Sequence, residues 1–180
     1  TPSEDLTAIT NIVNLLAQRN SGRALRIAEV GSWVGQSTLA IIAGFGQSGG
    51  RVYAIDTWEG TPSDVTGEIA KGTDPFKTFN DNLAEQIADS TVWPIRKASL
   101  DAAADWDMSL DMVYIDADHS YEAVKADIQA WLPHVSVGGI IAGHDYDVDR
   151  FPGVKQAVDE CLDLKVAVMG TVWYGYIFSR

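Results

Sequence analysis

The sequence predicts a single α/β domain with one doubly wound, mostly parallel sheet and helices on both faces. Short apolar runs that end in a glycine or an acid alternate with stretches whose apolar residues recur at helical spacing. The chain closes with two apolar runs separated by Gly170 alone, a gap that permits only an antiparallel pair. We therefore expect seven strands, the last of them reversed, in one domain over residues 1–180.

The first half of the chain alternates regularly between helices and strands. Helical spacing of apolar residues predicts helices over residues 6–16, 36–45 and 76–87. Continuous apolar runs predict strands over residues 26–30, 51–56 and 91–96. Pro94 favours an edge position for the third strand, because proline cannot donate to a sheet ladder. Glycines and prolines interrupt residues 59–74, which fit either a substrate lid containing a short helix or a solvated excursion.

The second half continues the alternation. Apolar runs predict strands over residues 110–116, 138–146, 165–169 and 171–178, and the fourth strand should lie beside the first. A short helical link is expected over residues 102–105. Ser120 can cap a helix over residues 121–132, and a last helix should cover residues 154–162.

Composition and charge narrow the class of function. The 180 residues are 46% hydrophobic and 21% charged, which suits one domain with a full core. A net charge of −12 argues against a nucleic-acid surface and against charge-driven membrane binding. Cys161 is the only cysteine, so no intrachain disulfide can form. No long apolar span or signal peptide is visible, so we expect a cytoplasmic protein, and exposed aromatic candidates near the termini would suit a homodimer.

Residues 27–38 form the most informative stretch, because they read as a strand, a glycine turn and the start of a helix. Gly31 and Gly35 permit a sharp turn, and such turns bind small charged ligands at the carboxyl end of a sheet. A dinucleotide fingerprint would need glycine at two positions that hold Trp33 and Gln36. The spacing therefore disfavours a nicotinamide-dependent oxidoreductase. Residues 29–37 read instead as E-x-G-x-x-x-G-x-S.

That pattern resembles motif I of the class I S-adenosylmethionine-dependent methyltransferases, most closely the small-molecule O-methyltransferases of the catechol and caffeoyl-coenzyme A type. The resemblance spans about residues 26–180 and implies a Rossmann-like fold with S-adenosylmethionine as cofactor. The motif residues that it places at the cofactor are Glu29, Gly31, Ser32, Trp33, Gly35 and Ser37. The competing interpretation is an ordinary βα turn of a doubly wound sheet.

Further cofactor contacts are expected after the second and third strands. Asp56 ends the second strand, and its two oxygens match the vicinal hydroxyls of a ribose, although it could also cap the following turn. Thr57 and Trp58 follow, and the Trp58 ring could cover the adenine or the mouth of the site. By resemblance, Ser99 contacts the adenine.

Acids and imidazoles end the fourth and fifth strands, at one edge of the predicted sheet. Converging carboxylates need a cation or shared protons. By resemblance to metal-dependent caffeoyl-coenzyme A-type and antibiotic or sugar O-methyltransferases, Asp116, His144 and Asp145 hold a divalent metal, with Asp116 also near the cofactor. Asp118 or His119 would be the catalytic base. Both families place an acid at position 144, so its histidine weakens the case for Mg²⁺, favours Mn²⁺, Fe²⁺ or Zn²⁺, or means that it is no ligand.

These residues predict transfer of a methyl group from S-adenosylmethionine to a hydroxyl of a small molecule such as a sugar, polyol or phenol. The divalent metal would lower the pKa of that hydroxyl. Tyr146 and residues 151–153 would shape the pocket. The alternatives are a metal-independent methyltransferase and a non-catalytic cofactor-binding relative. The sequence does not name the acceptor.

Overall fold

The fold is a seven-stranded sheet with helices on both faces, seen in a computed structural model that describes residues 2–20, 22–61, 65–163 and 165–178. The strands are β1 (Leu25–Val30), β2 (Gly50–Asp56), β3 (Val92–Arg96), β4 (Leu110–Ile115), β5 (Val135–Gly143), β6 (Val166–Met169) and β7 (Val172–Tyr176). Their order across the sheet is β3-β2-β1-β4-β5-β7-β6. Of the seven described strands, only β7 runs opposite to all the others, so the predicted class, the reversed last strand and the edge position of β3 are confirmed.

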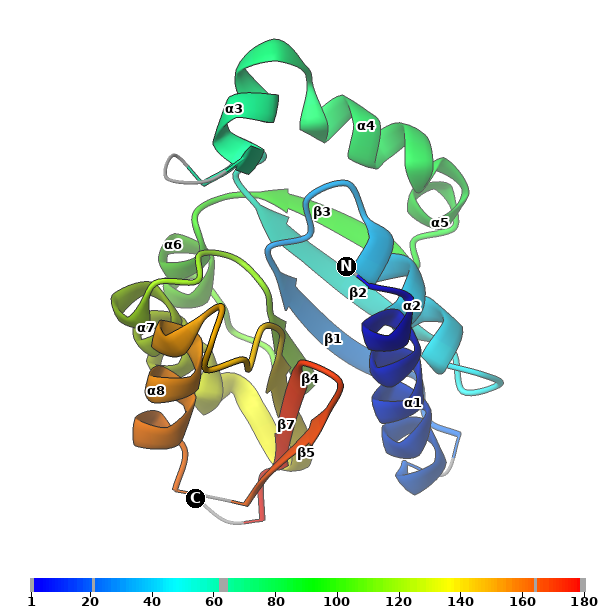
Figure 1. Cartoon of the computed structure of the whole chain (residues 1–180). Helices are drawn as coiled ribbons and strands as arrows, with labels where there is room; N and C mark the ends of the chain where they lie inside the picture. The colour runs from blue at the N-terminus through cyan, green and yellow to red at the C-terminus, as the bar shows by residue number, and fades with distance from the viewer. Residues whose placement is uncertain (1, 21, 62–64, 164, 179–180) are drawn as a thin grey trace.

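The helices divide between the two faces of the sheet. They are α1 (Ser3–Arg19), α2 (Gln36–Gly44), α3 (Val65–Gly72), α4 (Pro75–Asn82), α5 (Ala84–Ala88), α6 (Ser99–Ala104), α7 (Tyr121–Trp131) and α8 (Pro152–Cys161), with a 3₁₀ turn at Leu132–His134. Figure 1 shows α1 and α2 on one side of the sheet and α6, α7 and α8 on the other. α3 and α4 lie at the top of that view, above β2 and β3.

The alternation of side chains along the central strands builds two apolar layers. In β4, Met112 and Tyr114 pack into the layer under α1 and α2, whereas Val113 and Ile115 pack into the layer under α7 and α8. All four are essentially buried, as expected for a central parallel strand covered on both faces. The strand ends next to this core are therefore held rigidly, and they carry the predicted site.

The structure corrects two predicted boundaries. The helix predicted over residues 76–87 is two helices, because Leu83 leaves the helical conformation between α4 and α5. This break lets Leu83 bury its side chain against Gly35, and Asn82 Nδ2 donates to the carbonyl of Val34 at 2.9 Å. β5 runs from Val135 to Gly143 instead of over residues 138–146, and its pairing with β4 is irregular between the Leu110–Val135 and Met112–Ile140 pairs.

The irregular region after β2 contains the expected short helix, α3. Residues 62–64 of this region lie outside the described part of the chain. Among the described residues, no helix has both the length and the apolar character needed to cross a membrane.

Candidate active site

The glycine turn between β1 and α2 fits tightly between neighbouring elements. Gly31 has φ +91°, and a Cβ there would lie 2.1 Å from the backbone oxygen of Asp116. Gly35 also has φ +91°, and its Cβ would lie 2.6 Å from Leu83 Cδ1. Both positions therefore require glycine for backbone conformation and for space. The turn lies against the end of β4, where the predicted metal ligand Asp116 begins the next segment.

Trp33 takes a positive φ of 45°, which is unusual for a residue with a side chain. Two groups from the end of β2 hold it there. Asp56 Oδ2 accepts a hydrogen bond from the Trp33 backbone N–H at 2.8 Å, and Trp58 Nε1–H donates to the Trp33 carbonyl at 2.6 Å. Asp56 Oδ1 also accepts from the Trp58 N–H at 2.6 Å. The same carboxylate therefore links the turn after β1 to the segment after β2. Burial raises the pKa of Asp56, and these backbone donors oppose the rise.

A cavity of about 420 Å³ opens at the carboxyl ends of β1, β2 and β4, where doubly wound folds bind ligands. The predicted site residues that line it are Gly31, Ser32, Trp33, Ser37, Asp56, Thr57, Ser99, Asp116, Asp118 and His119. Five other predicted residues do not line it: Glu29, Gly35, Trp58, His144 and Asp145. Trp58 is 2% exposed and packs on Phe76 and Phe79, so it supports the turn from beneath instead of covering a ligand.

The cavity also has walls that sequence reasoning missed. They include Gln36, Gly60, Thr61, Thr66 and Lys97. Thr66 Oγ1 accepts from the Thr61 N–H at 2.9 Å and so ties the start of α3 to the irregular segment. The only signal in the sequence was position, since Lys97 directly follows the third strand and both threonines flank the expected lid.

Ser99 lines the cavity, but its hydroxyl is already engaged. It donates to Asp127 Oδ1 at 2.5 Å and accepts from Trp131 Nε1–H at 2.9 Å. Burial raises the pKa of Asp127 to about 6, although Ser99 opposes the shift. Ser99 can therefore offer a ligand its backbone and its surface, while its hydroxyl ties α6 to α7.

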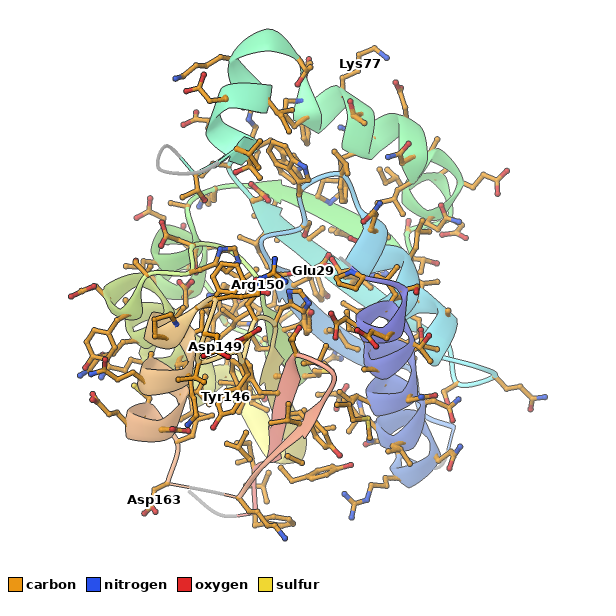
Figure 2. The ribbon with its side chains drawn as sticks, in the orientation of Figure 1. Glu29, Lys77, Tyr146, Asp149, Arg150 and Asp163 are labelled. Carbon is orange, nitrogen blue, oxygen red and sulfur yellow. The ribbon has the colours of Figure 1, made fainter. Side chains whose placement is uncertain are left out.

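Glu29 lies at the centre of the molecule in Figure 2 and is fully buried. Its Oε2 accepts from the Thr38 hydroxyl at 2.5 Å, whereas Oε1 has no hydrogen-bond partner among the described residues. Burial raises the pKa of Glu29 to about 7. The Glu29 carboxyl thus lies next to the glycine turn and forms no ion pair with any described residue.

The acids and imidazoles at the ends of β4 and β5 form one cluster. His144 Nδ1 lies 3.5 Å from Asp116 Oδ1 and 3.2 Å from Asp145 Oδ1. His119 Nε2 lies 2.9 Å from Asp145 Oδ2 and 3.7 Å from Asp116 Oδ1. Its ring packs against the ring of Phe151, with the centroids 4.7 Å apart and the planes tilted by 43°. Asp145 has φ +58°, so the backbone is strained where the cluster forms.

The members of this cluster shift one another's pKa values. Asp116 and Asp145 raise the pKa of His119 to about 10. Burial lowers the pKa of His144, but the same two acids outweigh it and raise the value to about 11. Burial alone would raise the pKa of both acids, and the imidazoles instead hold both below the ordinary range. Without an ion, these shifts favour the charged form of every group, with imidazolium for the two histidines and carboxylate for Asp116 and Asp145.

The geometry of the cluster also fits a divalent metal. One oxygen of Asp116, one of Asp145 and a nitrogen of His144 lie within 4.8 Å of one another. Adjacent ligands of a metal with bonds near 2.1 Å are about 3 Å apart, close to the observed spacings from His144 Nδ1. The mixed oxygen and nitrogen donors suit Mn²⁺, Fe²⁺ or Zn²⁺ better than Mg²⁺. The three residues could hold such an ion next to the cavity, because Asp116 belongs to both.

Other residues of the region have structural contacts. Asp118 accepts from the Ser120 N–H at 2.7 Å, just before α7, and Ser120 caps that helix as predicted. Tyr146, which is labelled in Figure 2, lies between β5 and α8, and its hydroxyl donates to Asp159 Oδ1 at 2.6 Å. Phe151 packs against the ring of His119, a member of the cluster. Tyr146 does not line the cavity that it was predicted to shape.

Comparison with known sequences identifies the family. A family described as a methyltransferase domain matches residues 28–146, from β1 to just beyond the second half of the cluster. The chain belongs to this methyltransferase family. The predicted membership of the class I S-adenosylmethionine-dependent methyltransferases is thereby confirmed. Motif I, Asp56 and the acid–imidazole cluster all lie within the matched region.

Solved structures of the methyltransferase fold resemble the whole chain. Cofactor-bound Rv0187 from MTB is 18% identical with a TM-score of 0.72, over 100% of this chain and 82% of that one. The O-methyltransferase NovP is 16% identical with a TM-score of 0.69, over 94% and 79%. CalS11, a TDP-rhamnose 3'-O-methyltransferase, is 17% identical with a TM-score of 0.65, over 96% and 78%. At these identities the likeness establishes the fold.

A curated relative is much longer than this methyltransferase domain. The uncharacterized protein y4gI of Sinorhizobium fredii is 28% identical over 129 residues, which are 70% of this chain. The chain spans 14% of the length of that relative.

Proposed function

We propose that this protein transfers a methyl group from S-adenosylmethionine to a hydroxyl group of a small molecule, with a divalent metal at the acceptor. One observation carries the proposal. Asp116 lines the cavity beside the glycine turn and also belongs to the cluster with His144 and Asp145. A cofactor in that cavity and a metal-bound hydroxyl would therefore meet at one residue.

The chain's own residues would position the cofactor. Asp56 uses one lone pair of each oxygen for the turn, and the remaining lone pairs can accept from the two ribose hydroxyls. The turn around Trp33 is wider than a dinucleotide turn and leaves room for the methionine part. Gly31 and Ser32 would lie along it, with Thr57 and Ser99 on the nucleoside side.

Asp116, Asp145 and His144 Nδ1 would hold the metal, which supplies Lewis-acid stabilisation of the acceptor oxygen when bound. Asp118 and His119 both line the cavity and are the candidates to take the proton from the acceptor hydroxyl. His119 could do so only as a neutral imidazole, which a metal cation shared by Asp116 and Asp145 would favour. Phe151 stacks on His119 and would limit the motion of that ring. Thr61 and Thr66 would offer the acceptor hydrogen-bonding groups from the segment around α3.

A small hydroxylated metabolite is the proposed acceptor. The cavity of about 420 Å³ would be shared between cofactor and acceptor, which favours a compact molecule. NovP is an O-methyltransferase, and CalS11 methylates a nucleotide sugar, so sugars, polyols and phenols form the first set to screen. The net charge of −12 supports a metabolite over a nucleic acid.

The test is transfer of a labelled methyl group from S-adenosylmethionine to a pool of sugars, polyols and phenols, with Mn²⁺ present. His119→Ala and Asp118→Ala should each lower turnover at least tenfold while cofactor affinity stays within about twofold. Asp163→Ala is the matched control, because this exposed aspartate lies far from Glu29 in Figure 2. If both site variants were fully active, the proposed proton transfer would be wrong.

A metal-independent methyltransferase is the second candidate, and one observation favours it. His119 lies between Asp116 and Asp145, and two imidazolium ions can neutralise the acids without a metal. Turnover that survives extensive chelation with EDTA would select this candidate. Loss of turnover in EDTA and its recovery on adding Mn²⁺ would select the metal-assisted one.

A further inference from the structure

The first turn of α1 carries a buried acid, Asp5, that lies next to His144 of the cluster. Asp5 is 1% exposed and shares the apolar face of its helix with Ile9. Its Oδ2 lies 3.1 Å from His144 Nε2. The connection thus joins the start of the chain to the end of β5, and it lies on the side of the ring opposite to the proposed metal ligands.

The turn between β6 and β7 fixes the orientation of the Asp5 carboxylate. Asp5 Oδ1 accepts from the Thr171 backbone N–H at 2.9 Å, and Oδ2 accepts from the Thr171 hydroxyl at 3.1 Å. Gly170 makes this approach possible, because a Cβ there would lie 2.3 Å from Asp5 Oδ1. Three segments far apart in the sequence therefore build one rigid acceptor next to His144.

An ionised carboxylate can only accept hydrogen bonds, so its partner must carry the proton. His144 Nε2 therefore donates to Asp5, and the Thr171 hydroxyl, which also lies 3.1 Å from Nε2, donates to the same carboxylate. In a neutral ring the lone pair is then on Nδ1, which faces Asp116 Oδ1 at 3.5 Å and Asp145 Oδ1 at 3.2 Å. This is the tautomer that a metal between those oxygens needs, since a metal binds the unprotonated nitrogen of a neutral imidazole.

We propose that Asp5 is a positioning residue that selects the Nε2–H tautomer of His144 and so presents Nδ1 to a divalent metal. The proposal rests on the proposed metal site and assigns it a supporting carboxylate from a remote helix. Carboxylate partners of metal-bound histidines commonly change metal affinity 10- to 100-fold when they are mutated. A purely structural Asp5 would affect folding and leave both the tautomer and the metal affinity unchanged.

Asp5→Asn separates these roles, because it changes one atom without changing the shape of the side chain. The Thr171 backbone N–H needs an acceptor, which forces the amide oxygen of Asn onto the Oδ1 position. The amide NH₂ then faces His144 Nε2 and the nearby Thr171 hydroxyl, so the ring loses the carboxylate that accepted from Nε2–H. In a neutral ring this change favours the proton on Nδ1, which directs an N–H at the metal site.

The measurements are Mn²⁺ and Zn²⁺ affinity by titration calorimetry and the ¹⁵N–¹H spectrum of the imidazole rings, on the full chain. We expect Asp5→Asn to weaken the binding of both metals at least tenfold, and we expect the Zn²⁺-loaded wild type to show an Nε2–H resonance of His144. Asp111→Asn is the matched control, because Asp111 is also buried but pairs with Arg23 at the opposite end of β4. That control should lower thermal stability without moving either readout.

Unchanged metal affinity in Asp5→Asn would overturn the proposal. A wild-type measurement decides the matter if the variant does not fold. In the Zn²⁺-loaded protein the Nε2–H resonance should persist and the ¹⁵N shift of Nδ1 should change, and coordination through Nε2 would refute the role of Asp5. If the wild type binds neither metal, the proposed metal site fails and the role of Asp5 fails with it, whereas methyl transfer itself is tested separately by the labelled-methyl assay.

Discussion

At the scale of one residue, burial of the Glu29 carboxyl in the apolar core changes its pKa and the stability of the protein. The carboxyl is fully buried, and its Oε2 accepts a hydrogen bond from the Thr38 hydroxyl at 2.5 Å. Burial raises its pKa to about 7 from an ordinary value of 4.5. The folded chain therefore binds this proton more tightly than the unfolded chain does. Ionising Glu29 must lower the stability of the cofactor-free protein.

The pH dependence of this effect can be measured with Glu29→Gln. Between about pH 4.5 and pH 7 the folded state holds the proton that the unfolded state has lost, so the free energy of unfolding falls as pH rises. The difference approaches about 3 kcal/mol above pH 7. In urea unfolding, the wild type should lose that much more stability than Glu29→Gln between pH 5 and pH 8. An exposed control, Glu122→Gln, should follow the wild type, and equal pH profiles for all three proteins would contradict the prediction.

At the same scale, we expect His144 to set the metal preference of the proposed site. Its Nδ1 would be a nitrogen donor where the resembling families place an oxygen donor, and Mg²⁺ binds nitrogen poorly. We expect calorimetry to show Mn²⁺ and Zn²⁺ binding at least tenfold more tightly than Mg²⁺ at neutral pH. His144→Ala should remove most of that difference by leaving the two acids alone. Equal affinities for Mg²⁺ and Mn²⁺ in the wild type would show that His144 is not a ligand.

Several elements meet at the glycine turn, and their spacing sets its shape. β1 and β4 are neighbours, so the turn after β1 passes directly over the residue that ends β4. α4 and α5 brace the other side, where Leu83 contacts Gly35 and Asn82 holds the Val34 carbonyl. The strained backbone of Trp33 persists because Asp56 and Trp58 fix it from β2.

Gly31→Ala tests this close approach of two elements. A Cβ at position 31 would lie 2.1 Å from the Asp116 backbone oxygen, so the turn must move away from β4. We expect a loss of roughly 3–5 kcal/mol in the free energy of unfolding and at least a tenfold loss of cofactor affinity. Gly49→Ala is the control, because Gly49 also has a positive φ but nothing within 4 Å of an added Cβ. It should cost about 1 kcal/mol and leave cofactor binding unchanged. Similar losses in both variants would show that backbone conformation alone matters.

At the scale of the whole molecule, the sequence predicted most of the fold and only part of the site. Strand and helix periodicity is local, so the order of elements and the reversed β7 followed directly from it. Leu83 shows the limit, since its helical spacing was correct while its packing on Gly35 ended the helix. Asp5 could not be assigned, because only the folded sheet brings α1, β5 and the turn before β7 together. An acid one turn before Ile9 on the apolar face was the only signal for it.

The continuous sheet and its two apolar layers also predict how the molecule unfolds. Every strand pairs with a neighbour from β3 to β6, and residues from both halves of the chain share each layer. We therefore expect one cooperative transition, with calorimetric and van't Hoff enthalpies that agree.

Ligand binding gives a second prediction for the whole molecule. S-adenosylhomocysteine at about 100 times its dissociation constant should add about 2.7 kcal/mol to the free energy of unfolding, which raises Tm by roughly 5–10 °C for a domain of this size. NAD⁺ at the same concentration should leave Tm unchanged, because the turn holds Trp33 and Gln36 where a dinucleotide needs glycine. Stabilisation by NAD⁺ alone would reject the assignment of the cavity to S-adenosylmethionine, and two separate transitions would reject the single domain.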